Sequence, residues 1–394
     1  MKYFILVPDG CSDWAIESLG GKTPLETADI SNINALAKVS ETGLVRTVPV
    51  GMEPGSDAAN LSLLGYNPAE CLTGRAPLEA AAMGIEMRED ETAIRTNFVT
   101  LDGEIIVDHS AGELENEDAE ILIKFIDEKL GSEDLRFYPG VSYRCLLIAK
   151  NAGELKAIPP HDILGKNFAE YFPQGDEIYR DLMRRSHELL KNHPLNIERM
   201  KNGKPAANSV WFWGQGKKMS LFPHKEKYGV KGCMVTAVNL LKGIAYYAGF
   251  SCPDIPGATG TIHTNYEGKA QAAIEAFKNG EDFVFLHVEA PDECSHCGDL
   301  DGKIKSMEYI DKKIFAAVYD YLKNCGEPFR ILVLPDHKTP LEIRTHTDEP
   351  IPFILFNSGK DLVADETKFF SENGVNENNF FESGSALAEY FFRK

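Results

Sequence analysis

FVFLHVEAPDECSH, residues 283–296, joins an apolar run to a series of acids and histidines. A short continuous apolar run is typical of a strand that is buried on both faces, as in a parallel sheet. Two other runs end in the same way, since FILV at 4–7 leads to Asp9 and ILVL at 331–334 leads to Asp336 and His337. Ligands bind outside the carboxyl ends of parallel strands, so we expect these groups to converge. The sequence therefore predicts an open α/β sheet with a site at one edge.

The side chains at these strand ends are metal ligands by type. The predicted ligands are Asp9, Asp292, His296, Asp336, His337 and His346. Carboxylate oxygen and imidazole nitrogen suit Mg, Mn and Zn, and six ligands are too many for one tetrahedral ion. Two ions a few ångströms apart would use them all and could act on a phosphoryl group. Any one of these residues could equally be a surface acid or a hydrogen-bonded histidine, so the prediction rests on the set.

A nucleophile candidate, Ser56, lies in PGSDAANLSLLG at residues 54–65. The glycine permits a tight turn and ANLSLL reads as a short helix, which places Ser56 at a helix N-terminus that favours an anion. The alternative is an ordinary serine N-cap, because serine is among the commonest caps. The sequence shows no histidine relay around Ser56, so we expect a metal ion to activate its hydroxyl.

These blocks, with TGRAPLEA at 73–80 and HTDEP at 346–350, resemble the archaeal-type cofactor-independent phosphoglycerate mutases of the alkaline phosphatase superfamily. The resemblance covers nearly the whole chain. It implies a doubly wound α/β core like that of alkaline phosphatase and two divalent ions, drawn from Mn, Mg, Zn or Co. It also implies that Ser56 is phosphorylated and dephosphorylated while 3-phosphoglycerate becomes 2-phosphoglycerate. In this family pattern one ion has the ligands Asp292, His296 and His346, and the other has Asp9, Ser56, Asp336 and His337.

A phosphorylated acid as substrate also calls for cationic and polar groups. Arg75 is the best placed in sequence, because a planar guanidinium can bind phosphate or carboxylate through two hydrogen bonds. The other predicted substrate-binding residues are Asn60, Arg95, His109, Arg144 and Lys231. For each cation, a solvated position or a local ion pair is the competing interpretation.

The order of the segments predicts a core interrupted by an insert. Residues 1–88 and 206–394 are expected to form the metal-binding core, which resumes at the strand-like segment from Ser209. Residues 89–205 are expected to form an inserted α+β substrate cap. Within it, 93–101 and 104–107 resemble antiparallel strands around an Asp-Gly turn, and 117–130 and 177–190 resemble helices.

Composition limits the partners of this chain of 394 residues. A formal net charge of −19 argues against nucleic acid and acidic membranes, so we expect a small anionic substrate held in a local basic pocket. No apolar run reaches the roughly 20 residues of a membrane span, and the N-terminus does not read as a signal peptide. The eight cysteines are scattered, which favours a reduced cytoplasmic setting. Whether the chain forms a homo-oligomer is left open.

Two alternatives remain at this stage. A bacterial subgroup that resembles this motif set has been proposed to phosphorylate homoserine, and the metals and Ser56 would serve either reaction. A catalytically inactive member that acts as a metal-dependent binding protein is the alternative from another class. The presence of every expected ligand and of Ser56 argues against the second alternative.

Overall fold

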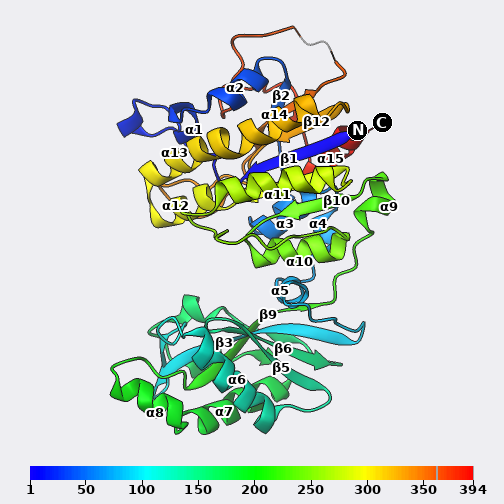
Figure 1. Ribbon diagram of the computed structural model, residues 1–394. Coiled ribbons are helices and arrows are strands. Elements are labelled where there is room, and N and C mark those ends of the chain that lie inside the picture. Colours follow the sequence, from blue (N-terminus) through cyan, green and yellow to red (C-terminus); the bar gives the residue numbers. More distant parts are fainter. Residues whose placement is uncertain (361–362, 394) are drawn as a thin grey trace. The chain divides into compact units, whose positions relative to one another are not determined.

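A computed structural model describes residues 1–360 and 363–393. The chain divides into two compact units. The core unit comprises Met1–Leu72 and Ser220–Lys394, and the inserted unit comprises Thr73–Met219 (Figure 1). The predicted division into a metal-binding core and a substrate cap at 89–205 concerns the roles of the two parts and stays a prediction.

The core unit is built on a seven-stranded sheet with the order β10-β11-β1-β12-β13-β2-β14. Its strands are β10 (Gly232–Val235), β11 (Phe283–Val288), β1 (Lys2–Pro8), β12 (Phe329–Val333), β13 (Ile351–Asn357), β2 (Glu41–Val45) and β14 (Phe380–Phe381). The first four are parallel, whereas β13 runs antiparallel to both of its neighbours. Val7 pairs with His287 and Leu6 pairs with Val333, so the predicted strands end together at one edge.

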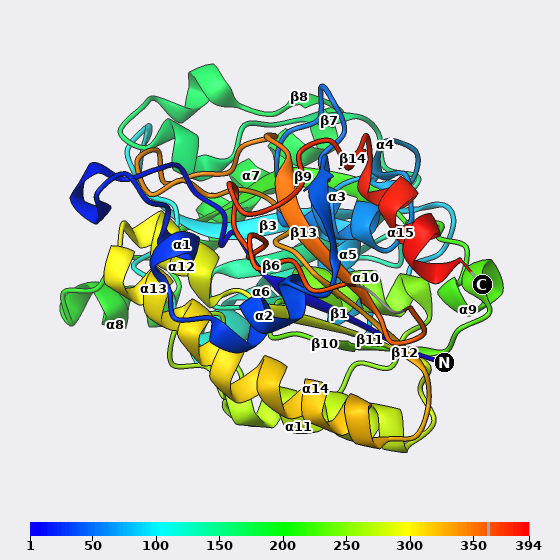
Figure 2. The ribbon, with the colours of Figure 1, turned by 90° about the horizontal axis from the view of Figure 1, so that it is seen from above.

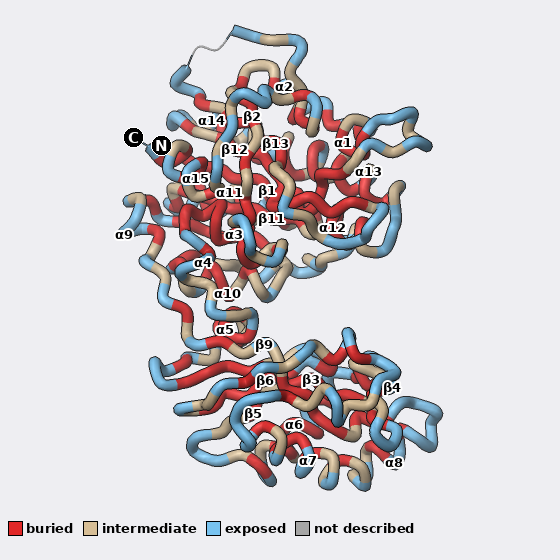
Figure 3. The backbone as a smooth tube through the Cα atoms, turned by 180° about the vertical axis from the view of Figure 1, so that it is seen from behind, coloured by how far each residue is buried: buried red, intermediate tan, exposed pale blue. Residues whose placement is uncertain are grey.

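Helices cover both faces of this sheet, as the view from above shows (Figure 2). One face carries α2 (Ser31–Ala37), α11 (Tyr266–Lys278), α13 (Leu300–Tyr309) and α14 (Ala316–Asn324), and the other carries α3 (Ser56–Leu63), α10 (Asn239–Ala248) and α15 (Gly384–Phe392). Alternate strand residues such as Phe4, Leu286 and Val333 pack with the first group of helices in a buried cluster. Because apolar side chains point to both faces, the strands read as continuous apolar runs and are buried (Figure 3).

Shorter elements complete the core unit. They are η1 (Glu17–Leu19), α1 (Pro24–Thr27), α4 (Pro68–Cys71), α9 (His224–Tyr228), α12 (Ala290–Cys297) and the π-helical segment η4 (Ile310–Phe315). Helix α12 follows β11 directly, with Pro291 in its first turn, where a missing N–H costs nothing. This short helix holds Asp292 and His296 on one face, as the four-residue spacing predicts.

The inserted unit has its own sheet and core. Its sheet has the order β4-β3-β6-β5, formed by β4 (Ile105–Asp108), β3 (Glu91–Asp102), β6 (Arg144–Lys150) and β5 (Leu135–Val141), and β9 (Ser209–Lys217) also pairs with β3. The remaining elements are α5 (Ala76–Ala82), α6 (Asn116–Leu130), β7 (Leu155–Lys156), η2 (Pro160–Ile163), η3 (Phe168–Tyr171), β8 (Gln174–Gly175), α7 (Glu177–Leu190) and α8 (Pro194–Lys201). The antiparallel β3–β4 pair and the helices at 117–130 and 177–190 confirm the predictions for those segments.

One strand differs from the sequence expectation. The apolar segment from Ser209 was expected to resume the core sheet, whereas β9 pairs antiparallel with β3 of the inserted unit from Ser209–Val99 to Lys217–Thr92. The aromatic side chain of Trp211 is buried in the core of the inserted unit. A continuous apolar strand fits either sheet, so its partner is set by tertiary contacts that a local pattern does not reveal.

Candidate metal centre

Asp336 and Asp9 form the centre of the candidate site, and both are buried. Asp9 follows the end of β1, and Asp336 follows β12, its neighbour in the sheet. One oxygen of Asp336 accepts hydrogen bonds from the backbone N–H groups of Gly10 (3.2 Å) and His337 (3.0 Å). Its other oxygen accepts one from the side chain of Asn60 (2.8 Å). These bonds fix the carboxylate at the carboxyl edge of the sheet.

Three side-chain oxygen atoms surround one ring nitrogen of His337. Its Nε2 lies 3.1 Å from Ser56 Oγ, 3.5 Å from Asp336 Oδ2 and 3.6 Å from Asp9 Oδ1. Its Nδ1 lies 3.1 Å from the hydroxyl of Thr339, which itself donates to Asp292 Oδ1. The Thr339 oxygen therefore accepts the ring N–H at Nδ1, and Nε2 presents a lone pair to the three oxygens.

A second group of ligands surrounds α12. His296 Nε2 lies 3.1 Å from Asp292 Oδ2 and 3.0 Å from His346 Nε2, and His346 Nε2 lies 3.5 Å from Asp292 Oδ1. The Nδ1 atoms of the two rings face backbone carbonyls, of Arg344 for His296 (2.9 Å) and of Pro54 for His346 (3.3 Å). A carbonyl only accepts, so both rings carry a proton on Nδ1 and point their Nε2 atoms at each other.

The electrostatics of the site reflect this crowding of acids. Burial, together with the charges of Asp336 and Asp292, raises the pKa of Asp9 well above its usual value. Burial also opposes ionisation of Asp292, but hydrogen bonds from His296 and His346 outweigh it and keep the pKa of Asp292 well below its usual value. The hydrogen bond to Asp292 raises the pKa of His296 to about 9. The raised pKa values of Asp9 and His296 mean that both residues tend to hold a proton. A bound cation would neutralise the same negative charge of the buried carboxylates.

The donor set fits divalent ions. Ligand atoms of one metal ion stand about 3.0–3.4 Å apart when the bonds are near 2.1 Å, and the distances above cluster there. Among the described residues, Asp9 Oδ1 and Asn60 Oδ1 are buried without a hydrogen-bond partner, so their lone pairs are open to a cation. Two groups of side chains have ligand atoms within 4.8 Å of one another, namely Asp292, His337 and His346, and Asp9, His287 and Asp336.

Ser56 occupies the first position of α3. Gly55, and not Ser56, is the N-cap residue, and its extended backbone has φ −177°. The hydroxyl of Ser56 is thus not used as a cap and faces His337 instead. Ser56 and His337 are 281 positions apart in the sequence, so their contact is not visible as a local histidine pattern around Ser56.

Sequence reasoning left several buried residues of this site without a role. Thr339 follows Asp336-His337 by two positions, and His287 lies in β11 with its Nε2 3.0 Å from Asp9 Oδ2. Burial lowers the pKa of His287 to about 4, and burial together with the charge of Asp292 raises the pKa of Glu289 to about 7. Lys269 donates to the backbone carbonyl of His287 (3.1 Å). A polar residue inside an apolar strand, such as His287, is the signal that could have identified it.

Two predicted substrate-binding residues belong to the core unit. Asn60 lies in α3 and donates to Ser56 O and Asp336 Oδ2, both at 2.8 Å, so it reaches the centre. Lys231 precedes β10, at the amino ends of the parallel strands, where its ammonium group lies 3.2 Å from Glu281. Lys231 comes before its strand, whereas Asp9 comes after a parallel strand. The structure therefore places Lys231 at the opposite edge of the sheet from Asp9.

The other four predicted substrate-binding residues belong to the inserted unit. Arg95 pairs with Glu79 at 2.5 Å and stacks over Trp213 at 4.2 Å. The exposed Arg144 stacks over Tyr143 at 4.9 Å. The ring of His109 lies 6.0 Å from that of His161. Burial lowers the pKa of His161, although the charge of Asp162 opposes this shift.

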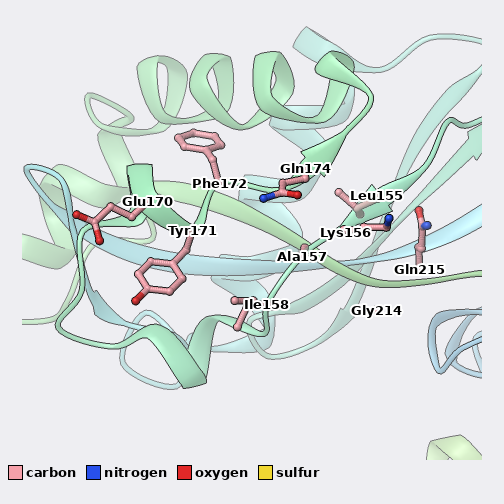
Figure 4. Close-up of a pocket in the computed structure, with 10 residues that line it drawn as sticks. All are labelled: Leu155, Lys156, Ala157, Ile158, Glu170, Tyr171, Phe172, Gln174, Gly214 and Gln215. Atoms are coloured by element: carbon pink, nitrogen blue, oxygen red, sulfur yellow. The ribbon is translucent and has the colours of Figure 1, made fainter.

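A separate cavity of about 590 Å³ lies within the inserted unit. Figure 4 shows its lining, which comes from residues 155–158, 170–172, 174 and 214–215. Lys156, Glu170 and Gln174 give it polar groups of both charges, and Tyr171 and Phe172 give it apolar surface. None of the predicted site residues lines this cavity.

The described part of the chain contains no helix with the length and apolar character that a membrane crossing requires.

The fold and the acid–histidine centre define an α/β protein with a candidate divalent-metal site at the carboxyl edge of its parallel strands. Comparison with known sequences extends this result. Residues 37–196 match the family model of 2,3-bisphosphoglycerate-independent phosphoglycerate mutase. A protein of that name from Methanosarcina barkeri is 47% identical over 379 residues, which are 95% of each chain. A Geobacter sulfurreducens protein, named as a probable member, is 42% identical over 99% of each chain.

Solved structures agree with the sequence comparison. A protein of Pyrococcus horikoshii has a TM-score of 0.82 at 28% identity, over 99% of this chain and 97% of its own. The cofactor-independent phosphoglycerate mutase of Thermoplasma acidophilum has a TM-score of 0.68 at 26% identity, over 100% and 99%. The chain belongs to the 2,3-bisphosphoglycerate-independent phosphoglycerate mutase family, whose members are isomerases.

Proposed function

We propose that this chain interconverts 3-phosphoglycerate and 2-phosphoglycerate without a bisphosphoglycerate cofactor, through a phosphorylated Ser56 at a two-metal site. The observation that carries the proposal is the 3.1 Å distance between Ser56 Oγ and His337 Nε2, among buried carboxylates at a helix N-terminus. The names of relatives that are 42–47% identical over nearly the whole chain support the reaction.

The pattern of the family divides the residues present between two ions. Asp292, His296 and His346 would hold one divalent cation, and Asp9, Ser56, Asp336 and His337 would hold the other. When bound, such cations supply positive charge that lowers the pKa of the serine hydroxyl and neutralises phosphoryl oxygens. The oxygen and imidazole donors suit Mn, Mg, Zn or Co.

The side chains then perform two phosphoryl transfers in sequence. In the first, Ser56 Oγ forms a bond to phosphorus as the bond between phosphorus and the 3-oxygen of the substrate breaks. The proton that leaves Ser56 balances the proton that the 3-oxygen of glycerate gains. In the second, the 2-oxygen of glycerate forms a bond to phosphorus and loses its proton, the Oγ–P bond breaks, and Ser56 Oγ gains a proton, which restores the hydroxyl. The backbone N–H groups at the start of α3 favour the transferred anion throughout.

We also assign substrate binding to the arginines Arg75, Arg95 and Arg144 of the inserted unit, together with His109. Arg95 and Arg144 lie on neighbouring strands of one sheet, and the ring of His109 lies 6.0 Å from that of His161. In a chain with net charge −19, such a group of cations is suited to a phosphate or a carboxylate. The assignment predicts that Arg75→Ala raises KM for 3-phosphoglycerate more than it lowers kcat.

A coupled assay tests the main proposal. The Mn-loaded protein is given 3-phosphoglycerate without bisphosphoglycerate, and in a parallel reaction homoserine with a nucleoside triphosphate. We expect 2-phosphoglycerate to form, Ser56→Ala to abolish its formation, and Ser62→Ala, a control in the same helix, to retain it. Formation of phosphohomoserine alone would overturn the substrate assignment and keep the nucleophile. Full activity of Ser56→Ala would overturn the nucleophile itself.

A further inference from the structure

His287 is a fully buried imidazole that the division of ligands between the two ions does not use. It lies near the carboxyl end of β11, whose neighbours in the sheet are β10 and β1. Its Nε2 lies 3.0 Å from Asp9 Oδ2, and together with Asp9 and Asp336 it forms a group whose ligand atoms are within 4.8 Å of one another. Most buried polar groups in proteins have a partner, and the atoms next to this ring nitrogen are carboxylate oxygens.

The contact between His287 and Asp9 does not have the geometry of a hydrogen bond. Within the described part of the chain, Nε2 of His287 has no hydrogen-bond partner, although the carboxylate oxygen is at 3.0 Å. The oxygen therefore lies to the side of the ring N–H direction. Two ligands of one metal ion meet in this way, because each points at the ion and not at the other ligand.

The other nitrogen of the ring supports the same interpretation. Nδ1 lies 3.5 Å from the hydroxyl oxygen of Thr236, the residue that follows β10. That oxygen already accepts from the N–H of Val238 and retains a second lone pair. A proton on Nδ1 pointing to Thr236 leaves the lone pair of Nε2 directed at the carboxylates, which is the arrangement of metal-binding histidines.

We propose that His287 is a further ligand of the cation shared by Asp9 and Asp336, with Thr236 as the residue that orients its ring. This inference rests on the two-metal site proposed above and is independent of the substrate. His287 adds an imidazole to the ligand set of Asp9, Ser56, Asp336 and His337, and it lies next to Oδ2 of Asp9, whereas His337 lies next to Oδ1.

Metal affinity tests the proposal without reference to turnover. Two Co(II) ions are expected per wild-type chain, counted by elemental analysis, with dissociation constants from chelator competition and with visible absorption bands that report their ligands. His287→Leu is expected to raise the dissociation constant of one Co(II) ion at least about tenfold and to change the absorption bands of that ion. The binding of the other ion is expected to be unaffected. Thr236→Val should lower the affinity for the same ion about tenfold, and Thr236→Ser, which keeps the hydroxyl, should bind it with near-normal affinity.

The matched control is His224→Phe, which removes another fully buried imidazole of the core unit. Both nitrogens of His224 lack partners in the described structure, and its ring packs against Phe250 and Phe283. We expect this control to bind both ions normally. Unchanged affinity and spectra in His287→Leu and Thr236→Val would overturn the proposal, as would a third ion that His287→Leu alone removes. If His287→Leu does not fold, the Thr236 pair decides the outcome.

Discussion

Thr339 donates a hydrogen bond of 2.6 Å from its hydroxyl to Asp292 Oδ1. The hydroxyl oxygen of Thr339 in turn accepts a hydrogen bond from Nδ1 of His337 at 3.1 Å. One buried hydroxyl thus links a proposed ligand of the first ion to a proposed ligand of the second. It also fixes the tautomer of His337, because only a ring protonated at Nδ1 can donate to it.

Thr339→Val is therefore expected to lower the affinity for both ions, by about tenfold each. The substitution removes the hydrogen bonds that orient Asp292 and His337. Thr339→Ser keeps the hydroxyl and should retain near-normal affinity. Titration of the metal-free protein with Mn(II) by calorimetry measures both constants. If Thr339→Val lowered the affinity for only one ion, the Thr339 hydroxyl would not couple the two groups of ligands.

Removal of divalent ions is expected to lower the melting temperature. The carboxylates of Asp9, Asp292 and Asp336 are buried together, and the pKa of Asp9 is raised by burial and by the other two charges. A cation that binds only the folded chain stabilises it by about 2.7 kcal/mol when its concentration is 100 times the dissociation constant. Calorimetric scans with chelator and with added Mn(II) measure the shift. In Asp292→Asn the Mn-dependent shift should shrink, and an equal shift in this variant would count against the site.

The pH dependence of stability should reveal His224. Burial, with a contribution from the charge of Lys227, lowers the pKa of His224 to about 3, below the ordinary value of 6.5. Between these two values the unfolded chain takes up a proton that the folded chain does not, so stability is lost as the pH falls from about 6.5 toward 3. At pH 5 this loss is about 2 kcal/mol for one such group.

Urea unfolding of the metal-free protein at pH 7 and pH 5 measures this contribution. The wild type should lose about 2 kcal/mol more on acidification than His224→Phe, which has no ring to protonate. Phenylalanine suits the surrounding rings of Tyr228, Phe250, Phe283 and Phe392. Equal losses in the two proteins would mean that His224 is already protonated or exposed in the folded chain.

Local sequence patterns revealed the residues whose position follows from one strand or one helix turn. Asp9 and Asp336 follow continuous apolar runs, and the spacing of Asp292 and His296 matches a helix, so the structure has them where the pattern predicts. The contact of Ser56 with His337 could not be read in this way, because it depends on how α3 is placed against the sheet. The hydrogen bond from Thr339 to Asp292 depends on packing in the same way, because the two residues are 47 positions apart.

The division of the chain shows the same limit. The strands at 93–101 and 104–107 and the helices of the insert were predictable, because each has its own periodicity and an Asp-Gly turn marks the hairpin. The partner of β9 was not, since its pairing with β3 joins residues more than a hundred positions apart. A continuous apolar run specifies a buried strand without specifying a sheet.

Lys231→Ala tests whether the place of a lysine in the fold, and not its charge alone, decides whether it binds substrate. Lys231 was predicted to bind substrate, but it lies at the amino ends of the parallel strands and pairs with Glu281 at 3.2 Å. We expect the variant to keep kcat and KM for 3-phosphoglycerate within about twofold of the wild type, and to lose less than about 1 kcal/mol of stability, because the lysine is largely exposed. Asn60→Ala, which removes an amide that touches Asp336, should lower kcat strongly in the same assay. A large rise in KM for Lys231→Ala would show that the substrate reaches that edge of the sheet.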